Sequence, residues 1–183
     1  MFVVMSHAPS RLRLTAGLAL VALVVACFAV FGLSAEAVVN AFGCAVLVAV
    51  AVTDLERRIV PNRIILPALV VALVVQTALD PSAEWGIASV AAGGFYLVAA
   101  LVYPAGLGMG DVKLAAFLGA WLGYPVIVAL FAGSLLTLVP AVVIIATKGK
   151  EGRKAAIPFA PFLAGGALIA LFFGDAILDA WLG

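Results

Sequence analysis

Residues 125–147 read PVIVALFAGSLLTLVPAVVIIAT, an apolar run without a charged side chain. A run of about 20 apolar residues is long enough to cross the hydrocarbon core of a bilayer as a helix. A helix is expected because in lipid it satisfies the hydrogen bonds of its own backbone. Four basic residues follow the run within a few positions, namely Lys148, Lys150, Arg153 and Lys154. They indicate that the run ends at a membrane surface.

Similar apolar runs occupy most of the chain. Of its 183 residues, 67% are hydrophobic and only 10% are charged, whereas a soluble domain is about half apolar and a quarter charged. The runs lie at residues 14–33, 37–53, 64–79, 87–103, 112–122, 125–147 and 159–181. The sequence therefore predicts an all-α, polytopic membrane protein with about seven transmembrane helices. It excludes a soluble globule, a disordered chain and a nucleic-acid binder with a basic face.

The fifth run is short, and it admits two interpretations. It is either a crossing of its own or the start of one long helix with the sixth run, kinked at residues 123–125. Charge favours separate crossings, because an N-terminus on the inside then places all 10 Lys and Arg residues in inner segments. The outer segments hold only acids, which are Glu36, Asp80, Glu84, Asp175 and Asp179. This is the distribution that the positive-inside rule predicts, with a cytoplasmic N-terminus.

The N-terminal part of the chain also leaves a question open. Its basic start, apolar run and the segment SAEA at 34–37 resemble a cleavable signal peptide, although the run is longer than a usual signal core. Cleavage would leave six crossings with unchanged topology. We divide the chain at this point, into residues 1–36 and a membrane domain at 37–183. Cys27 and Cys44 lie in the first two runs, where they either meet across the hairpin or are two small buried side chains.

Two carboxylates stand at inner ends of apolar runs. Asp54 follows the second run, and Asp111 precedes the fifth run in the segment GLGMGDVKL at residues 106–114. Two carboxyls that share one proton supply both a general base and a general acid, which is what amide hydrolysis needs. Gly108 and Gly110 lack a Cβ, so a substrate strand has room to approach the backbone beside Asp111. Taken one at a time, an interfacial aspartate or a GxG turn has an ordinary structural explanation.

Three segments together carry a family resemblance. The segment GMGDVKL at 108–114 resembles the GxGDxKL signature of type IV prepilin peptidases, which are GxGD-type intramembrane aspartic proteases. The segment DLERRIVPN at 54–62 resembles their first catalytic segment, and IPFAPFL at 157–163 resembles their third signature, IPFGPFL. The resemblance covers roughly residues 38–170. Val60 and Ala160 are departures, because the family more often has Ile and Gly at these positions.

The resemblance implies a function and a set of site residues. It implies that Asp54 and Asp111 are the catalytic dyad and that the substrates are pilin-like precursors with a short basic leader before a hydrophobic helix. The supporting motif residues are Gly108, Gly110, Lys113, Pro61, Asn62, Pro158 and Pro161. Lys113 is either an inner-surface anchor or a charge partner, and the two prolines that precede apolar runs suit the start of a helix. No metal or other cofactor is expected.

Long members of that family carry a cytoplasmic insertion with paired CxxC motifs that is linked to methylation of the new amino end. This sequence has no CxxC pair and resembles the short form. We therefore expect an aspartic endopeptidase of the cell membrane that removes leaders at the cytoplasmic face without N-methylation. Its partners would be the precursors and the lipid bilayer, and not nucleic acid. The alternatives are a small transporter, disfavoured because the charges lie at run ends, and an inactive pilus or secretion assembly factor.

Overall fold

The computed structural model describes residues 10–103, 106–148 and 158–182. Every regular element in these ranges is a helix. In chain order they are α1 (Ser10–Phe31), α2 (Ala35–Arg57), α3 (Asn62–Leu79), α4 (Glu84–Val102), α5 (Met109–Leu122), α6 (Val126–Lys148) and α7 (Ala160–Leu182). The predicted all-α fold with seven helices is confirmed. The basic residues Lys150, Arg153 and Lys154 lie outside the described residues.

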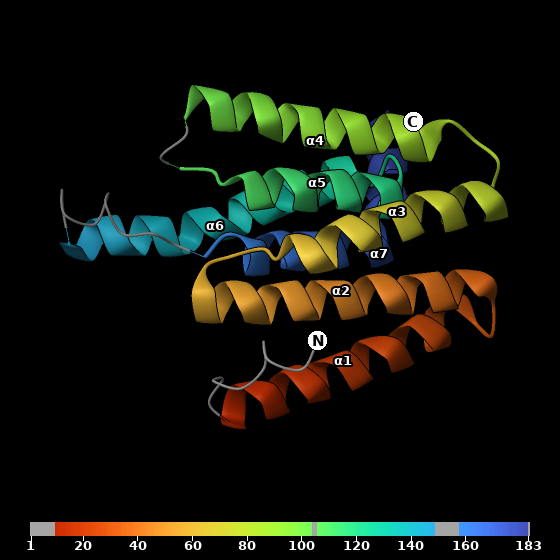
Figure 1. Cartoon of the computed structure of the whole chain (residues 1–183), viewed down its shortest axis with the longest axis horizontal. Coiled ribbons are helices and arrows are strands. Elements are labelled where there is room, and N and C mark those ends of the chain that lie inside the picture. Colours follow the sequence, from red (N-terminus) through yellow and green to blue (C-terminus); the bar gives the residue numbers. More distant parts are fainter. Residues whose placement is uncertain (1–9, 104–105, 149–157, 183) are drawn as a thin grey trace.

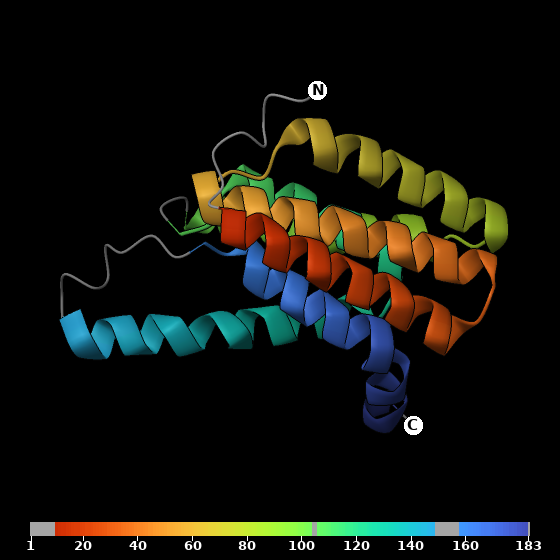
Figure 2. The same cartoon turned by 90° about the horizontal axis from the view of Figure 1, so that it is seen from below.

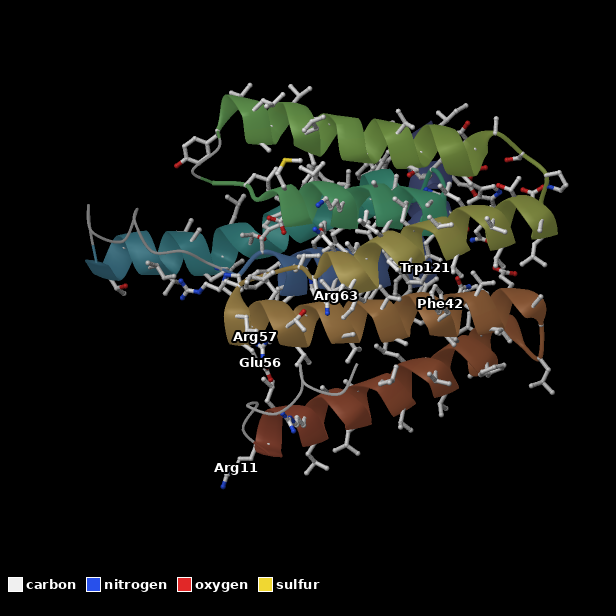
Figure 3. All side chains as sticks on the ribbon, in the orientation of Figure 1. Arg11, Phe42, Glu56, Arg57, Arg63 and Trp121 are labelled. Carbon is white, nitrogen blue, oxygen red and sulfur yellow. The ribbon has the colours of Figure 1, made fainter. Side chains whose placement is uncertain are left out.

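Successive helices run in opposite directions through one bundle (Figure 1). Arg11, Arg57 and Arg63 lie toward the same end (Figure 3), which we call the basic end. The other end, where α2 and α4 begin, carries Glu36 and Glu84 in their first helical turns, and we call it the acidic end. The separation of charge that the sequence predicts is therefore a property of the folded bundle. It supports a cytoplasmic position for the basic end, by the positive-inside rule.

Six of the helices are long and apolar enough to cross a membrane, and α5 is not one of these six. With 14 residues, α5 is about 21 Å long at 1.5 Å per residue. It lies between α3 and α4 in Figure 1 and packs mainly against both. The fifth and sixth runs do not fuse, because Gly123 adopts a positive φ of 67° and ends α5 before α6 begins.

Helix α5 is the core of the bundle. Its largest side chains, Phe117 and Trp121, are 0% and 1% exposed and stack with a centroid separation of 5.8 Å. Polar groups fasten it to its neighbours: Trp121 Nε1 donates to Asn40 Oδ1 of α2 at 3.1 Å, and Ser89 Oγ of α4 donates to the carbonyl of Ala116 at 2.9 Å. Because such bonds are satisfied inside the bundle, they fix the position of α5 among the longer helices.

Helices α6 and α7 form a closely packed pair beside this core. The end of α6 extends beyond the other helices at the basic end (Figure 2). Helix α7 begins at the basic end and runs back along the bundle toward the acidic end (Figure 2). Its first turn lies beside the last turn of α2, because Ala160 contacts Asp54. The N-terminus of α7 is thereby brought to the region of the predicted catalytic residues.

Candidate active site

Asp54 lies in the last turn of α2. The helix continues past it to Arg57 and ends at Arg58, which adopts the left-handed conformation with φ 53°. The side chain of Asp54 is only 6% exposed. Its Oδ2 accepts a hydrogen bond from the backbone N–H of Ala160, the first residue of α7, at 3.1 Å. A carboxylate at this point satisfies one of the free N–H groups of a helix N-terminus and faces the positive end of its dipole.

Asp111 is the third residue of α5 and lies outside the six spanning helices. Its Oδ2 accepts the backbone N–H of Gly108, the residue that precedes the helix, at 3.2 Å. Burial is the main reason that the pKa of Asp111 is raised to about 6; the charge of Asp54 contributes to the rise, and the Gly108 N–H opposes it. The two carboxyls are therefore near enough for the charge of one to act on the other.

The first two motif segments are in direct contact. A Cβ on Gly110 would lie 2.8 Å from Cβ of Val60, so the absence of a side chain lets the start of α5 approach the α2–α3 connection. Lys113 Nζ of α5 donates a hydrogen bond of 2.8 Å to Oδ1 of Asn62, the first residue of α3. These two contacts hold the turn that carries Asp111 against the segment that follows Asp54.

The third motif segment meets the first through α7. The N–H of Ala160 holds Asp54, and the ring of Phe159 lies 6.0 Å from the ring of Tyr96 in α4. Pro161 occupies the second position of α7, where a missing N–H costs no helical bond. Pro158 precedes the helix, and Pro61 is the N-cap residue of α3. Pro61 and Pro158 therefore lie at helix starts, as the sequence predicts.

Two features of the site were not found from the sequence. The backbone donor of Ala160 leaves no signal in the residue type, because every residue except proline has an N–H. Tyr96 is a buried residue in the middle of an apolar run, at 4% exposure, and nothing in its neighbourhood marks it. The catalytic roles of Asp54 and Asp111, and the supporting roles of the other motif residues, stay predictions.

Two cavities of the bundle lie away from the carboxylate pair. One, of about 320 Å³, opens at the acidic end and is lined by Glu36, Asn40, Gln76 and Trp121, among others. A second, of about 370 Å³, is an apolar groove between α4 and α6. Neither is lined by Asp54 or Asp111. Within the described ranges, no group of three or more His, Cys, Asp and Glu side chains is placed to hold a metal ion.

The fold and site define a class of protein: a polytopic helical membrane protein with one buried and one partly buried carboxylate at one end of its bundle. A family model described as the type IV leader peptidase family matches residues 41–145. The chain belongs to this family, and the resemblance predicted from its three motif segments is confirmed. No solved structure matches the chain.

Curated relatives agree with this assignment. The chain is 34% identical over 160 residues to a Bacillus subtilis (strain 168) protein named prepilin leader peptidase/N-methyltransferase, a match that covers 83% of this chain and 62% of the relative. Proteins of the same name from Legionella pneumophila and Burkholderia pseudomallei (strain 1026b) are 28% and 35% identical, over 84% of this chain. Those matches cover 56% and 52% of the relatives. The chain thus spans between half and two thirds of the length of these relatives.

Proposed function

We propose that this chain is an aspartic endopeptidase that removes the leader of pilin-like precursors, with Asp54 and Asp111 as its catalytic pair. The observation that carries the proposal is the convergence of three motif segments on two carboxyls. Asp54 is held by the N–H of Ala160 and Asp111 by that of Gly108. Membership of a leader peptidase family supports the substrate class. Each carboxyl accepts from one backbone donor, which fixes its orientation without cancelling its charge.

Hydrolysis by this pair requires one shared proton. The ionised carboxyl takes a proton from water as the water oxygen bonds to the scissile carbonyl carbon, and the protonated carboxyl donates to the carbonyl oxygen. When the tetrahedral intermediate collapses, the C–N bond breaks and the leaving nitrogen takes a proton from the pair. Burial of Asp111 supports this chemistry, because it favours the neutral form of one carboxyl.

We place cleavage at the cytoplasmic face of the cell membrane. The carboxylates lie at the basic end of the bundle, and a basic leader on the substrate stays on the same side by the same charge rule. We assign the chemistry to residues 37–183, because α1 packs at the edge of the bundle against α2 and the family match begins at residue 41.

We also propose that the chain cleaves without methylating the new amino end. Cys27 and Cys44, the only cysteines in the sequence, contact each other in α1 and α2 and form no paired CxxC metal site. Purified chain, precursor and S-adenosylmethionine, followed by intact mass, test this. A mature product without an added methyl group is expected, and a product heavier by one methyl group would contradict it.

The catalytic assignment is tested with Asp54→Asn and Asp111→Asn in a leader-removal assay. Both substitutions keep the size of the side chain and remove one half of the proton-sharing pair, so each variant should fold and lose cleavage. Glu56→Gln is the matched control, because it makes the same chemical change in the same turn of α2 and should retain activity. Normal cleavage by either aspartate variant, or equal loss in Glu56→Gln, would refute the assignment.

The pH profile gives a second test. An exposed aspartate has a pKa of about 3.9, whereas burial raises that of Asp111 to about 6. The form with one proton on the pair therefore persists to higher pH, and kcat/KM should fall only as the pH rises past about 6 and both carboxyls ionise. A profile already declining at pH 4 to 5 would contradict a buried, proton-sharing pair.

A further inference from the structure

The two cysteines form a close pair in the membrane, remote from the site described above. Cys27 Sγ of α1 and Cys44 Sγ of α2 are 3.8 Å apart. Both side chains are 0% exposed, and both are free thiols. A disulfide has an S–S length of about 2.0 Å, so bonding requires the sulfurs to approach by only about 1.8 Å.

We propose that Cys27 and Cys44 are a disulfide-forming pair that fastens α1 to α2. The reaction breaks both S–H bonds and forms one S–S bond, and the two electrons and two protons pass to an apolar oxidant that enters through the lipid. Dioxygen is the simplest such oxidant, and it is reduced to hydrogen peroxide. The inference does not depend on the proposed peptidase activity, because neither sulfur belongs to the carboxylate site.

The position of α1 makes the required approach feasible. Helix α1 lies at the edge of the bundle and contacts mainly α2 (Figure 1). Most of its side chains face outward, for example Leu18, Val21 and Val25, each more than 60% exposed. A small shift of α1 toward α2 therefore disturbs few other contacts, and the same freedom lets a small apolar oxidant reach the sulfurs.

The side of the membrane also suits a disulfide. Cys27 is one helical turn before the end of α1 at Phe31, next to the α1–α2 turn at the acidic end. The positive-inside rule places that end outside the cell, and disulfides persist on the oxidising side of a membrane. The bond would join positions 17 residues apart. It would link the two arms of the α1–α2 hairpin, whose second arm carries Asp54.

The experiment uses the full chain in membranes, with a copper–phenanthroline complex in air as the oxidant. After oxidation the sample is denatured, treated with a maleimide and measured by intact mass. The reduced chain should take two maleimides, one for each of its two cysteines. The oxidised chain should take none, weigh two hydrogen atoms less than the reduced chain and run as a monomer on a non-reducing gel. Cys27→Ala and Cys44→Ala should each keep one reactive thiol after oxidation.

A matched control tests whether the observed geometry matters. The double variant Cys27→Ala/Leu23→Cys moves the α1 thiol by one turn along the same face, and it should keep two reactive thiols under conditions that consume both in the native chain. Equal oxidation of this variant would overturn the proposal. The proposal would also be overturned if the oxidised native chain still took two maleimides while the same oxidant closed the bond in the denatured chain. Formation of covalent dimers without any internal disulfide would overturn it as well.

Discussion

Helices α1 and α5 are both apolar, yet they occupy opposite environments. Helix α1 has 22 residues and lies at the edge of the bundle, and Cys27 is the only one of its described side chains that is fully buried. Helix α5 has 14 residues, and most of its side chains are buried among the other helices. In lipid, an apolar side chain is equally well accommodated by a lipid tail or by a neighbouring helix, so apolarity alone does not decide which helix becomes the core.

What distinguishes α5 is the size and bonding of its residues. Glycine and alanine recur along it, for example Gly110, Ala116 and Gly119. These small residues let the α2–α3 connection and α4 approach its backbone. Its polar contacts reach other helices, whereas Thr15 of α1 bonds only within its own helix, to the carbonyl of Leu12. Close backbone packing and interhelical hydrogen bonds are what hold helices together in a membrane.

The largest expected effect comes from adding one methyl group to α5. A Cβ on Gly119 would overlap the backbone carbonyl of Ala88 in α4, and a backbone group cannot rotate away as a side chain does. Gly119→Ala should therefore lower the free energy of unfolding by about 3 kcal/mol, at the upper end of overpacking costs, or prevent assembly. Unfolding in mixed micelles and the yield of folded protein measure this.

Gly17→Ala is the matched control in α1, because a Cβ there meets no atom within 4 Å. It should leave stability unchanged or raise it slightly, since alanine favours a helix by up to about 1 kcal/mol over glycine. Similar losses in the two variants would show that α5 is no more tightly packed than α1 and would remove the basis of the comparison.

Much of the fold was predictable from sequence because its signals are local. Apolar runs such as 125–147 are long enough to cross the hydrocarbon core, and basic residues mark their inner ends, so helix number and direction follow without knowledge of contacts. The packing is not local in this sense. Nothing in residues 112–122 shows that this run, rather than a longer one, is the centre, since that depends on which helices approach its glycines and alanines.

In the candidate site, too, some residues could be predicted from local sequence and others could not. The GxGD segment and the segment after Asp54 carry side chains whose types and order indicate paired carboxylates. Their partners are less visible, because the N–H of Ala160 and the ring of Tyr96 reach the site only when α7 and α4 fold against it. The end of α2 also extends beyond the apolar run, to Arg57, since a polar last turn at the membrane surface keeps its backbone bonds without being apolar.

A smaller effect should follow from removing one interhelical bond of α5. Asn40→Ala leaves the indole N–H of Trp121 without its acceptor in a side chain that is 1% exposed. An unsatisfied buried donor costs about 1–2 kcal/mol, which the unfolding equilibrium should report. Thr15→Val is the control in α1: it removes a bond within the helix at an exposed position and should change stability by less than about 0.5 kcal/mol. Equal losses of stability in the two variants would mean that a bond between helices stabilises the core no more than a bond within one exposed helix.

The smallest effect concerns the attachment of α5 at the basic end. Lys113→Met and Asn62→Ala each remove the 2.8 Å bond between the ammonium of Lys113 and the amide oxygen of Asn62. A charge-assisted bond at an exposed position should contribute about 0.5–1 kcal/mol. Each variant should also reduce cleavage a few-fold, because the turn that carries Asp111 is held less firmly against the α2–α3 connection. The double variant should lose no more than either single variant, since the same bond is absent in all three.

Arg11→Met removes a positive charge from α1 at the same end and should leave cleavage intact, which separates loss of this bond from loss of surface charge. Additive losses in the double variant would show that the two side chains act independently, and the contact would then have no part in positioning Asp111.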